Sequence, residues 1–318
     1  TNRAAREMTN RIQKVVGGDF SELMVGNVHR FCSKFLFEQG RIPADSAIID
    51  DEEAVSIIAD YRNEDEEGVT RDFNRYKGYQ TIIFFQHFIY QLEHRHPWKY
   101  YLHPESFTDD DREAVKRICA SQKIEYDEQA VVNIYHHAQE YMDEANAPGL
   151  DGKTADRIRV LLWKMYYANC YARYKEENHL FDFEDLLLYT YDIYRSDPTC
   201  KRYPWIQVDE VQDLNGMQLA IIDLLTAEDN PMVMYLGDEQ QAIFSFMGAK
   251  VETLTLLKMR CKGNIHHLQR NHRSPKYLLD VFNDYAEKQL KIDRELLPLS
   301  DNDTKATSGD LRIIHSST

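Results

Sequence analysis

Long apolar runs and an initiator methionine are both missing from this chain of 318 residues. No apolar run reaches the roughly 20 residues that a membrane-spanning helix needs, so we expect no membrane partner. The first residues, TNRAAREMTNRIQ, carry charges where a secretory signal peptide has an apolar core. Because the first residue is Thr1 rather than methionine, we expect the chain to begin partway through a larger protein.

Closely spaced cysteines are also missing. The chain contains five cysteines, and no two of them form a CxxC pair. Zinc ribbons and small disulfide-rich domains depend on such spacing, so both classes are excluded. The pattern is typical of a reduced chain, and we expect a cytoplasmic protein; its cysteines are Cys32, Cys119, Cys170, Cys200 and Cys261.

The chain also has no excess of basic residues: its formal net charge is −15. Such a charge argues against nonspecific binding of polyanions across the whole surface. It leaves room for a local basic track, because charges are screened within roughly 10 Å at physiological salt. The acidic residues concentrate in residues 48–68, whereas the N-terminus is basic, with Arg3, Arg6, Arg11 and Lys14 against Glu7.

What is present is an alternation of strands and helices around residues 205–236. Residues 205–208 (WIQV) and 232–236 (MVMYL) are short apolar runs that predict buried strands, and each ends at acidic residues. The segment between them has apolar residues at helical spacing, at Met217, Ala220, Ile221, Leu224 and Leu225. This order predicts a parallel α/β sheet, which binds ligands outside the carboxyl ends of its strands.

Residues 41–178 have a different, mostly helical pattern, and a helical insertion into the α/β core is the simplest explanation. In this segment one predicted helix has an apolar face formed by Ile158, Leu161, Leu162, Met165 and Tyr166. The stretch FDFEDLLLYTYDIYR predicts another, with Phe183, Leu186, Leu187, Tyr191 and Tyr194 on its apolar face. After residue 274 we expect a helix and then a strand at 311–315.

Two adjacent carboxylates, Asp209 and Glu210, end the first predicted strand. A carboxylate at a strand end beside a phosphate pocket can hold Mg²⁺, and its neighbour can orient or deprotonate an attacking water. The alternative is a pair of solvated carboxylates that cap the next helix. The pair alone leaves both interpretations open.

Several further motifs stand in a fixed order along the chain. They are TNRAAREM at the start, NVHRFCSKFL (27–36), FDFEDLL (181–187), VDEVQD (208–213), GDEQQAIFSFMGA (237–249) and LQRNHRSP (268–275). In order and approximate spacing this series resembles the motifs of the UvrD/Rep-type superfamily 1 DNA helicases. The resemblance covers most of the chain.

The resemblance implies a role in ATP hydrolysis for several of these residues. It gives Asp209 the Mg²⁺ and Glu210 the role of catalytic base. Gln241 matches the glutamine that senses the γ-phosphate of ATP and couples it to DNA. Arg273 matches the arginine finger, a group worth roughly 10³–10⁵ in rate in phosphoryl transfer. His272 stands where the family usually has a tyrosine against the adenine.

The resemblance also implies contacts with single-stranded DNA. Thr1, Asn2 and His29 occupy positions of strand-contacting motifs, and Phe246 stands where the family stacks an aromatic ring on a base. Such stacking is worth roughly 1–3 kcal/mol per base. Without this context Phe246 is better explained as a core residue.

Two residues depart from the family pattern. Met247 replaces the arginine that generally follows the stacking aromatic, which removes a positive charge near the Asp209–Glu210 pair. Ala242 replaces a common serine, which is a smaller loss. The first departure puts the coupling of ATP to DNA in doubt.

The phosphate-binding loop GxxxxGK[ST] that such an enzyme needs is missing. The stretch APGLDGKT (147–154) fits a looser pattern, but no predicted strand runs into it and it falls in the helical segment. A Pro-Gly turn with Thr154 as the helix N-cap explains it without a function. A nucleotide hydrolase that uses Lys153 and is unrelated to DNA is the interpretation that this loop would support.

These observations together predict an α/β fold, with a RecA-like parallel sheet flanked by helices and a large helical insertion domain. We expect residues 1–40 and 179–273 to form the first RecA-like domain, 41–178 the inserted subdomain, and 274–318 the truncated start of a second RecA-like domain.

The predicted function is that of an ATP-dependent DNA helicase and translocase of the 3′ to 5′ type, with ATP, Mg²⁺ and single-stranded or partly duplex DNA as partners. We expect this chain alone to be inactive. The alternative is a catalytically dead single-stranded-DNA-binding module of the same fold.

Overall fold

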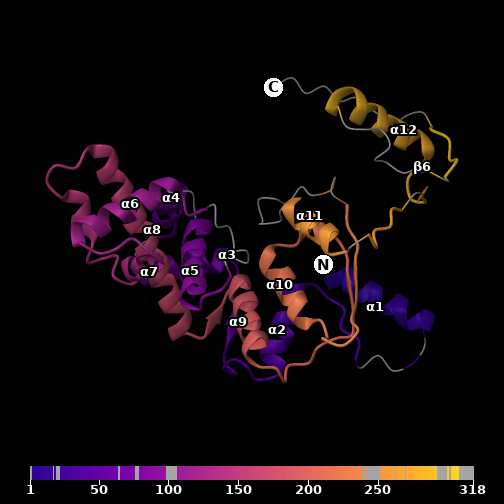
Figure 1. Ribbon diagram of the computed structural model, residues 1–318, viewed down its shortest axis with the longest axis horizontal. Helices are drawn as coiled ribbons and strands as arrows, with labels where there is room; N and C mark the ends of the chain where they lie inside the picture. The colour runs from indigo at the N-terminus through magenta and orange to yellow at the C-terminus, as the bar shows by residue number, and fades with distance from the viewer. Residues whose placement is uncertain are drawn as a thin grey trace. The chain divides into compact units, whose positions relative to one another are not determined.

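The computed structural model describes residues 2–16, 18, 22–63, 65–75, 79–97, 106–238, 241, 251–261, 263–268, 270–291, 299–300 and 302–307. The chain divides into two compact units, Thr1–Leu254 and Thr255–Thr318, and each is described by itself (Figure 1). The domain boundaries predicted from the sequence at residues 40, 178 and 273 remain predictions.

The first unit contains the predicted pair of parallel strands, but the prediction that they are buried is wrong: Trp205 is 60% and Met232 55% exposed. β3 (Trp205–Val208) and β4 (Met232–Tyr235) pair in parallel, with Trp205 opposite Met232 and Val208 opposite Tyr235. A short 3₁₀-helix, η4 (Val211–Asp213), and then α10 (Gly216–Leu225) connect the two strands. Parallel strands require such a crossover, because a tight turn joins only antiparallel strands.

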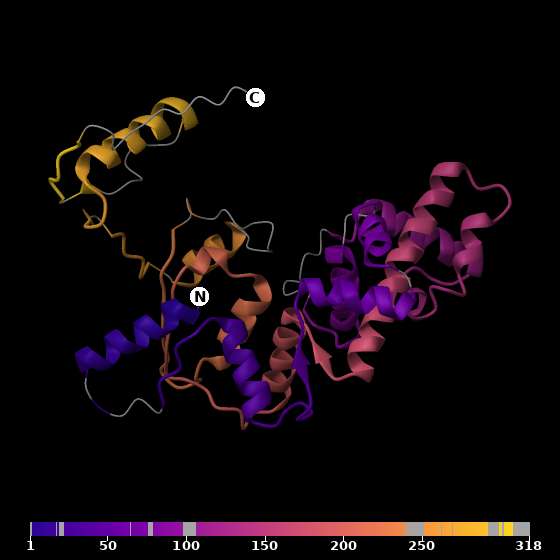
Figure 2. The same cartoon turned by 180° about the vertical axis from the view of Figure 1, so that it is seen from behind.

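Three helices share the core of this α/β part. α9 (Phe183–Ser196) contacts both α2 (Val28–Glu38) and α10, as the two views in Figures 1 and 2 show. Each helix contributes a fully buried residue to one apolar cluster, namely Leu36, Leu187 and Ile221. α1 (Asn2–Val16) precedes them in the chain.

The segment predicted to be helical consists of helices with one central member. α8 (Gly152–Glu177) contacts most of the others, and its predicted face is buried at Ile158, Leu161, Leu162 and Met165. β1 (Ala47–Ile48) and β2 (Leu180–Phe181), at the two ends of the segment, pair in parallel, so the chain enters and leaves it at neighbouring points. The other members are α3 (Asp51–Arg62), α4 (Glu66–Arg75), α5 (Tyr79–Glu93), α6 (Asp109–Gln122), α7 (Glu128–His136) and η3 (Met142–Asn146).

α11 (Val251–Arg260) spans the boundary between the units, and the second unit is small. Its strands β5 (Arg270–Asn271) and β6 (Leu299–Ser300) pair in parallel, and α12 (Lys276–Tyr285) contacts β6 and η7 (Ala286–Leu290). The helix predicted after residue 274 is confirmed. The strand predicted at 311–315 lies outside the described residues.

The described residues thus form an α/β structure that is mainly helical, and each of their sheets has two parallel strands. None of the described helices is both long and apolar enough to cross a membrane. One detail of the predicted pattern is wrong: Phe183 is 47% exposed, whereas Leu186, Leu187, Tyr191 and Tyr194 are buried. Phe183 is the first residue of α9, directly after its N-cap Asp182, where the helix has not yet reached the core.

Candidate functional site

The carboxyl ends of β3 and β4 lie side by side, and the predicted acidic pair follows β3. Backbone pairing continues past both strands, because the Leu236 N–H donates to the Val208 carbonyl at 2.8 Å and the Val211 N–H donates to the Leu236 carbonyl at 2.9 Å. Asp209 and Glu210 therefore lie beside the loop that follows β4, and both side chains are exposed. Such an edge is where parallel α/β sheets bind ligands.

Glu210 has a strained backbone conformation. Its φ of 51° and ψ of 42° lie in the left-handed region, which costs a residue other than glycine roughly 1–2 kcal/mol. The turn places the Glu210 N–H 3.0 Å from Asp209 Oδ1 and starts η4. Backbone strain of this kind clusters at functional sites, so the observed strain supports a functional interpretation of the pair.

The alternative, that the acidic pair caps the next helix, is wrong. The N-cap of α10 is Asn215, whose Oδ1 accepts the Gln218 N–H at 2.9 Å, while Gln218 Oε1 accepts the Asn215 N–H at 3.0 Å. Glu210 precedes η4 but its side chain makes no capping hydrogen bond. Asp209 and Glu210 form no ion pair with any residue that the structure describes, so their charges remain available to a ligand.

Two further residues, Gln241 and Asp213, lie near the ends of β3 and β4. Gln241, on the loop after β4, is exposed and its Nε2 donates to Asp238 Oδ2 at 2.9 Å. Asp213 lies behind the acidic pair, where burial and the charge of Glu210 raise the pKa of its carboxyl group. The structure therefore brings Gln241 to the same pair of strand ends as Asp209 and Glu210.

The residues predicted to contact DNA are less completely described. Thr1 and Phe246 lie outside the described residues, as do Ala242 and Met247, and Asn2 is the first residue of α1. His29 lies in the first turn of α2, half-buried, with its ring edge-on to that of Phe183 at 5.7 Å between centroids. Burial lowers the pKa of His29, which favours the neutral imidazole. Contact with DNA stays a prediction for all four.

His272 and Arg273 belong to the second unit, directly after β5, and both side chains are exposed. The Asn271 side chain fixes the backbone of this turn, because its Oδ1 accepts the N–H groups of Arg273 and Ser274, each at 2.9 Å. Their predicted roles beside ATP stay predictions.

The stretch that imitates a phosphate loop is a helix start. The N-cap of α8 is Asp151, whose Oδ1 accepts the Thr154 N–H at 3.0 Å, so the prediction of Thr154 as the N-cap is wrong. Asp151 precedes Thr154 and offers a carboxylate acceptor, which is the stronger cap for these N–H groups. Gly149 has a φ of 87° that only glycine adopts readily, and the segment before the turn is η3 rather than a strand.

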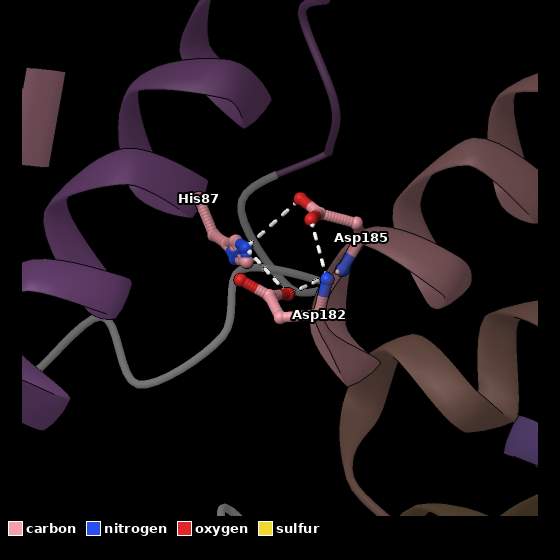
Figure 3. A group of neighbouring side chains, drawn as sticks. All are labelled: His87, Asp182 and Asp185. Atoms are coloured by element: carbon pink, nitrogen blue, oxygen red, sulfur yellow. Dashed lines mark hydrogen bonds and ion pairs between the residues drawn. The ribbon is translucent and has the colours of Figure 1, made fainter. Parts of the chain in front are cut away.

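A second acidic cluster, which the sequence did not reveal, lies where α9 meets α5. Figure 3 shows His87 of α5 pointing toward Asp182 and Asp185 at the start of α9. His87 Nε2 is 3.2 Å from Asp182 Oδ1 and 3.3 Å from Asp185 Oδ1, and all three side chains are buried. Their ligand atoms lie within 4.8 Å of one another, and a histidine with two carboxylates is a donor set that zinc can use.

Lys175 of α8 already supplies the positive charge in this cluster. Its Nζ is 2.5 Å from Asp182 Oδ2 and 2.5 Å from Asp185 Oδ2, and the residue is 3% exposed. A divalent cation would share this buried space with the ammonium group, and their repulsion would be strong in a medium of low dielectric constant. We therefore interpret these four residues, the Lys175 cluster, as a buried salt-bridge network that joins α5, α8 and α9.

Burial sets the charge of the histidine and of one aspartate in the Lys175 cluster. It lowers the pKa of His87 to about 4, although Asp182 opposes the shift, so the imidazole is neutral near pH 7. Burial and the neighbouring Asp182 raise the pKa of Asp185 to about 6. Burial also acts against ionisation of Asp182, but Lys175 and His87 hold its pKa below the ordinary value.

Comparison with known proteins decides the family. The family model described as the UvrD/REP helicase N-terminal domain matches residues 1–262. The chain belongs to the UvrD/REP helicase family. The resemblance inferred from the order of the motifs is thereby confirmed.

Among curated proteins, this member of the UvrD/REP helicase family is similar to a probable DNA helicase II homologue of Mycoplasma capricolum, with 22% identity over 90% of this chain and 33% of the relative. It is similar to the ATP-dependent DNA helicase PcrA of Staphylococcus aureus, with 23% identity over 89% of this chain and 32% of PcrA. It is also similar to the ATP-dependent DNA helicase SRS2 of Saccharomyces cerevisiae, with 24% identity over 94% of this chain and 23% of SRS2. The chain thus spans a third or less of the length of these relatives.

Proposed function

We propose that the protein hydrolyses ATP with Mg²⁺ and uses the energy to move 3′ to 5′ along single-stranded DNA and to unwind duplex DNA. The observation that carries the proposal is the Asp209–Glu210 pair. It is exposed and strained, and it lies at the ends of two parallel strands in a UvrD/REP family chain. The similarity to proteins named as ATP-dependent DNA helicases supports the same reaction.

The residues at the strand ends suit a magnesium nucleotide. Asp209 Oδ1 accepts the Glu210 N–H, which leaves Oδ2 for a hard cation such as Mg²⁺. Magnesium bound there would neutralise charge on the phosphate oxygens. Glu210 would take a proton from the attacking water, Gln241 would contact the γ-phosphate, and Arg273 would stabilise negative charge on the transferring group.

DNA binding completes the proposal. Thr1, Asn2, His29 and Phe246 would line the path of the single strand, with Phe246 stacked on a base. His272 would lie against the adenine of ATP. We further propose that β3 and β4 belong to a RecA-like sheet with helices on its faces, and that the protein works in the cytoplasm.

We also propose that these 318 residues alone do not turn over ATP. The strict phosphate-loop pattern does not occur in the sequence, and residues 147–154 form a capped helix start instead. A second candidate is a single-stranded-DNA-binding module of the same fold without catalysis, which is favoured by Met247 in place of the arginine that generally follows the stacking aromatic. Binding to single-stranded DNA that is tight and insensitive to nucleotide would favour this second candidate.

The experiment that tests the proposal is ATP hydrolysis by the whole natural gene product that carries these residues, with and without single-stranded DNA. We expect DNA-stimulated turnover that is lost in Asp209→Asn, because the remaining amide binds Mg²⁺ poorly. The matched control is Glu228→Gln, an exposed carboxylate on the loop before β4. Turnover that is equal in Asp209→Asn and wild type would overturn the assignment of the site.

A further inference from the structure

The loops that follow β3 and β4 are joined by one buried side chain, that of Gln212. Gln212 lies in η4 and is 1% exposed. Its Nε2 donates to Glu210 Oε2 at 2.6 Å, and its Oε1 accepts the backbone N–H of Asp238 at 3.1 Å. A single side-chain amide therefore bonds Glu210, the proposed base on one loop, to the backbone of the other loop.

The chemistry of both partners requires a side-chain amide at this position. Glu210 offers only acceptor oxygens when ionised, and the Asp238 N–H is only a donor. A glutamine satisfies both at once, whereas a glutamate repels Glu210 and a methionine bonds to neither. The amide also has a single suitable orientation, because the reverse one places an oxygen against the carboxylate.

Gly237 makes room for the two hydrogen bonds of the Gln212 side chain, which together form a bridge between the loops. A Cβ atom at Gly237 would lie 2.7 Å from Gln212 Oε1 and 2.7 Å from Val211 Cγ1, closer than real Cβ contacts. Any other residue at position 237 would push the amide away from the Asp238 N–H. Two separate segments of sequence are thus adapted to the same contact.

The bridge continues from Asp238 to Gln241, because Asp238 Oδ2 accepts Gln241 Nε2 at 2.9 Å and the Gln241 N–H donates to the Asp238 carbonyl at 3.1 Å. We propose that Gln212 is a positioning residue for the hydrolysis of ATP: it holds the Glu210 carboxylate in place and links it to the loop that carries Gln241. The inference rests on the proposed function, in which Glu210 and Gln241 act on the same phosphate.

This arrangement has two consequences for the reaction. The bond to Oε2 holds the carboxylate of a residue on a strained, exposed turn and leaves Oε1 to accept a proton from water. A shift of the β4 loop that moves Gln241 also pulls on Asp238, and through Gln212 on Glu210. Misplacement of a catalytic group by about 1 Å can cost roughly 10²-fold in rate. We therefore expect loss of the two Gln212 hydrogen bonds to lower the rate of the chemical step.

The test compares Gln212→Met and Gln212→Glu with wild type in DNA-stimulated ATP hydrolysis by the whole gene product. Methionine keeps the size of the side chain and removes both bonds, whereas glutamate keeps the acceptor for Asp238 and repels Glu210. We expect kcat to fall roughly 10–100-fold in both variants, with KM for ATP changed less than about twofold, because Gln212 is buried and touches no substrate. The double variant of Gln212→Met with Gln241→Ala is expected to lose less than the product of the two single losses.

The matched control is Gln218→Met, the same substitution in the first turn of α10, where Gln218 Oε1 accepts the N–H of the N-cap Asn215. It also removes a side-chain hydrogen bond, but it leaves Glu210 and Asp238 paired as in wild type. We expect it to lower the melting temperature slightly and to leave kcat unchanged. A kcat for Gln212→Met equal to that of the control would overturn the inference.

A second measurement separates this inference from the proposed function. Hydrogen exchange of the Asp238 amide reports the bridge without any ATP hydrolysis. We expect exchange to be faster in Gln212→Met than in wild type and Gln218→Met, and equal exchange in all three would overturn the link between the loops. A wild-type protein that does not hydrolyse ATP would instead overturn the proposed function, and with it the positioning role, whatever the exchange shows.

Discussion

Two carboxylate pairs in this protein are used in opposite ways. Asp182 and Asp185 are buried, form a reciprocal cap at the start of α9, and share the ammonium group of Lys175. Asp209 and Glu210 are exposed and form no ion pair with the described residues, and Glu210 has a left-handed backbone. The first pair has a counter-charge and capping hydrogen bonds within the fold, and the second keeps free acceptor oxygens at the cost of backbone strain.

This difference gives a physical way to tell a structural pair from a functional one. A buried carboxylate without compensation is too costly to retain, so the Asp182–Asp185 pair must have its counter-charge within the fold. An exposed pair needs no such partner, because water solvates it. The backbone strain at Glu210 supports the proposal that this exposed pair acts on a ligand.

The largest expected effect is at the Asp209–Glu210 pair, the proposed catalytic site. Glu210→Gln should reduce DNA-stimulated ATP hydrolysis roughly 10²–10⁴-fold, the range for loss of a general base, and leave the free energy of unfolding nearly unchanged. Turnover rates and denaturant unfolding curves on the same preparations check this. A clear loss of stability with full turnover would reverse the comparison.

Removal of the buried cation should have the largest effect on stability. Lys175→Met leaves two buried carboxylates without their counter-charge, which we expect to cost about 3–5 kcal/mol in the free energy of unfolding. Urea unfolding measures it, with Lys116→Met, which breaks an exposed ion pair with Glu113, as the control of small effect. Equal stability of the two variants would show that the Lys175 cluster contributes no more than a surface pair.

The pH dependence of stability sharpens the role of the Lys175 cluster. The pKa of His87 is lowered to about 4 in the folded protein, against about 6.5 in the unfolded chain. As the pH falls, the unfolded chain is therefore protonated at His87 before the folded protein is, and the stability that the neutral His87 contributes is lost between about pH 6.5 and 4. The pKa of Asp185 is raised to about 6, so its contribution is present below about pH 4 and is lost as the pH rises through 6. In wild type the two trends oppose each other between these limits.

Single substitutions should separate the two trends. Relative to wild type, His87→Gln should gain stability as the pH falls from 6 to 4, and Asp185→Asn should lose it, each with a slope of up to about 1 kcal/mol per pH unit. Urea unfolding at a series of pH values measures both slopes. Parallel curves for the three proteins would contradict the assigned pKa shifts.

The smallest effect concerns the phosphate-loop look-alike. Asp151→Ala removes the N-cap of α8, and we expect a drop of only a few degrees in melting temperature with ATP turnover unchanged. Lys153→Ala should change neither quantity. A loss of turnover in Lys153→Ala would show that residues 147–154 bind phosphate after all.

The position of the Asp209–Glu210 pair could be predicted from the sequence, whereas the Lys175 cluster could not, for a physical reason. Asp209 and Glu210 follow a strand that is visible in the sequence as WIQV, and the matching strand MVMYL predicts the parallel edge where they lie. Lys175 and Asp182 are close in sequence, but His87 is 98 residues from Asp185, and no pattern predicts that α5 crosses the start of α9.

Two local features could not be predicted from the sequence, namely the N-cap of α8 and the hydrogen bonds of Gln212. Thr154 and Asp151 are both good N-caps, and only the backbone shows which one precedes the first turn of α8. Gln212 stands inside VDEVQD, yet its bridge depends on the register of β3 with β4 and on the space at Gly237. The strand register and the space at Gly237 are both set by tertiary contacts.

The measurement that tests the central claim most directly is single-turnover hydrolysis of ATP bound to Glu210→Gln in the presence of Mg²⁺ and single-stranded DNA. We expect wild type to release phosphate, whereas the variant should bind ATP with similar affinity, unfold like wild type and retain the nucleotide uncleaved. Hydrolysis by the variant at the wild-type rate would contradict the account, because Glu210 would then be one more solvated carboxylate.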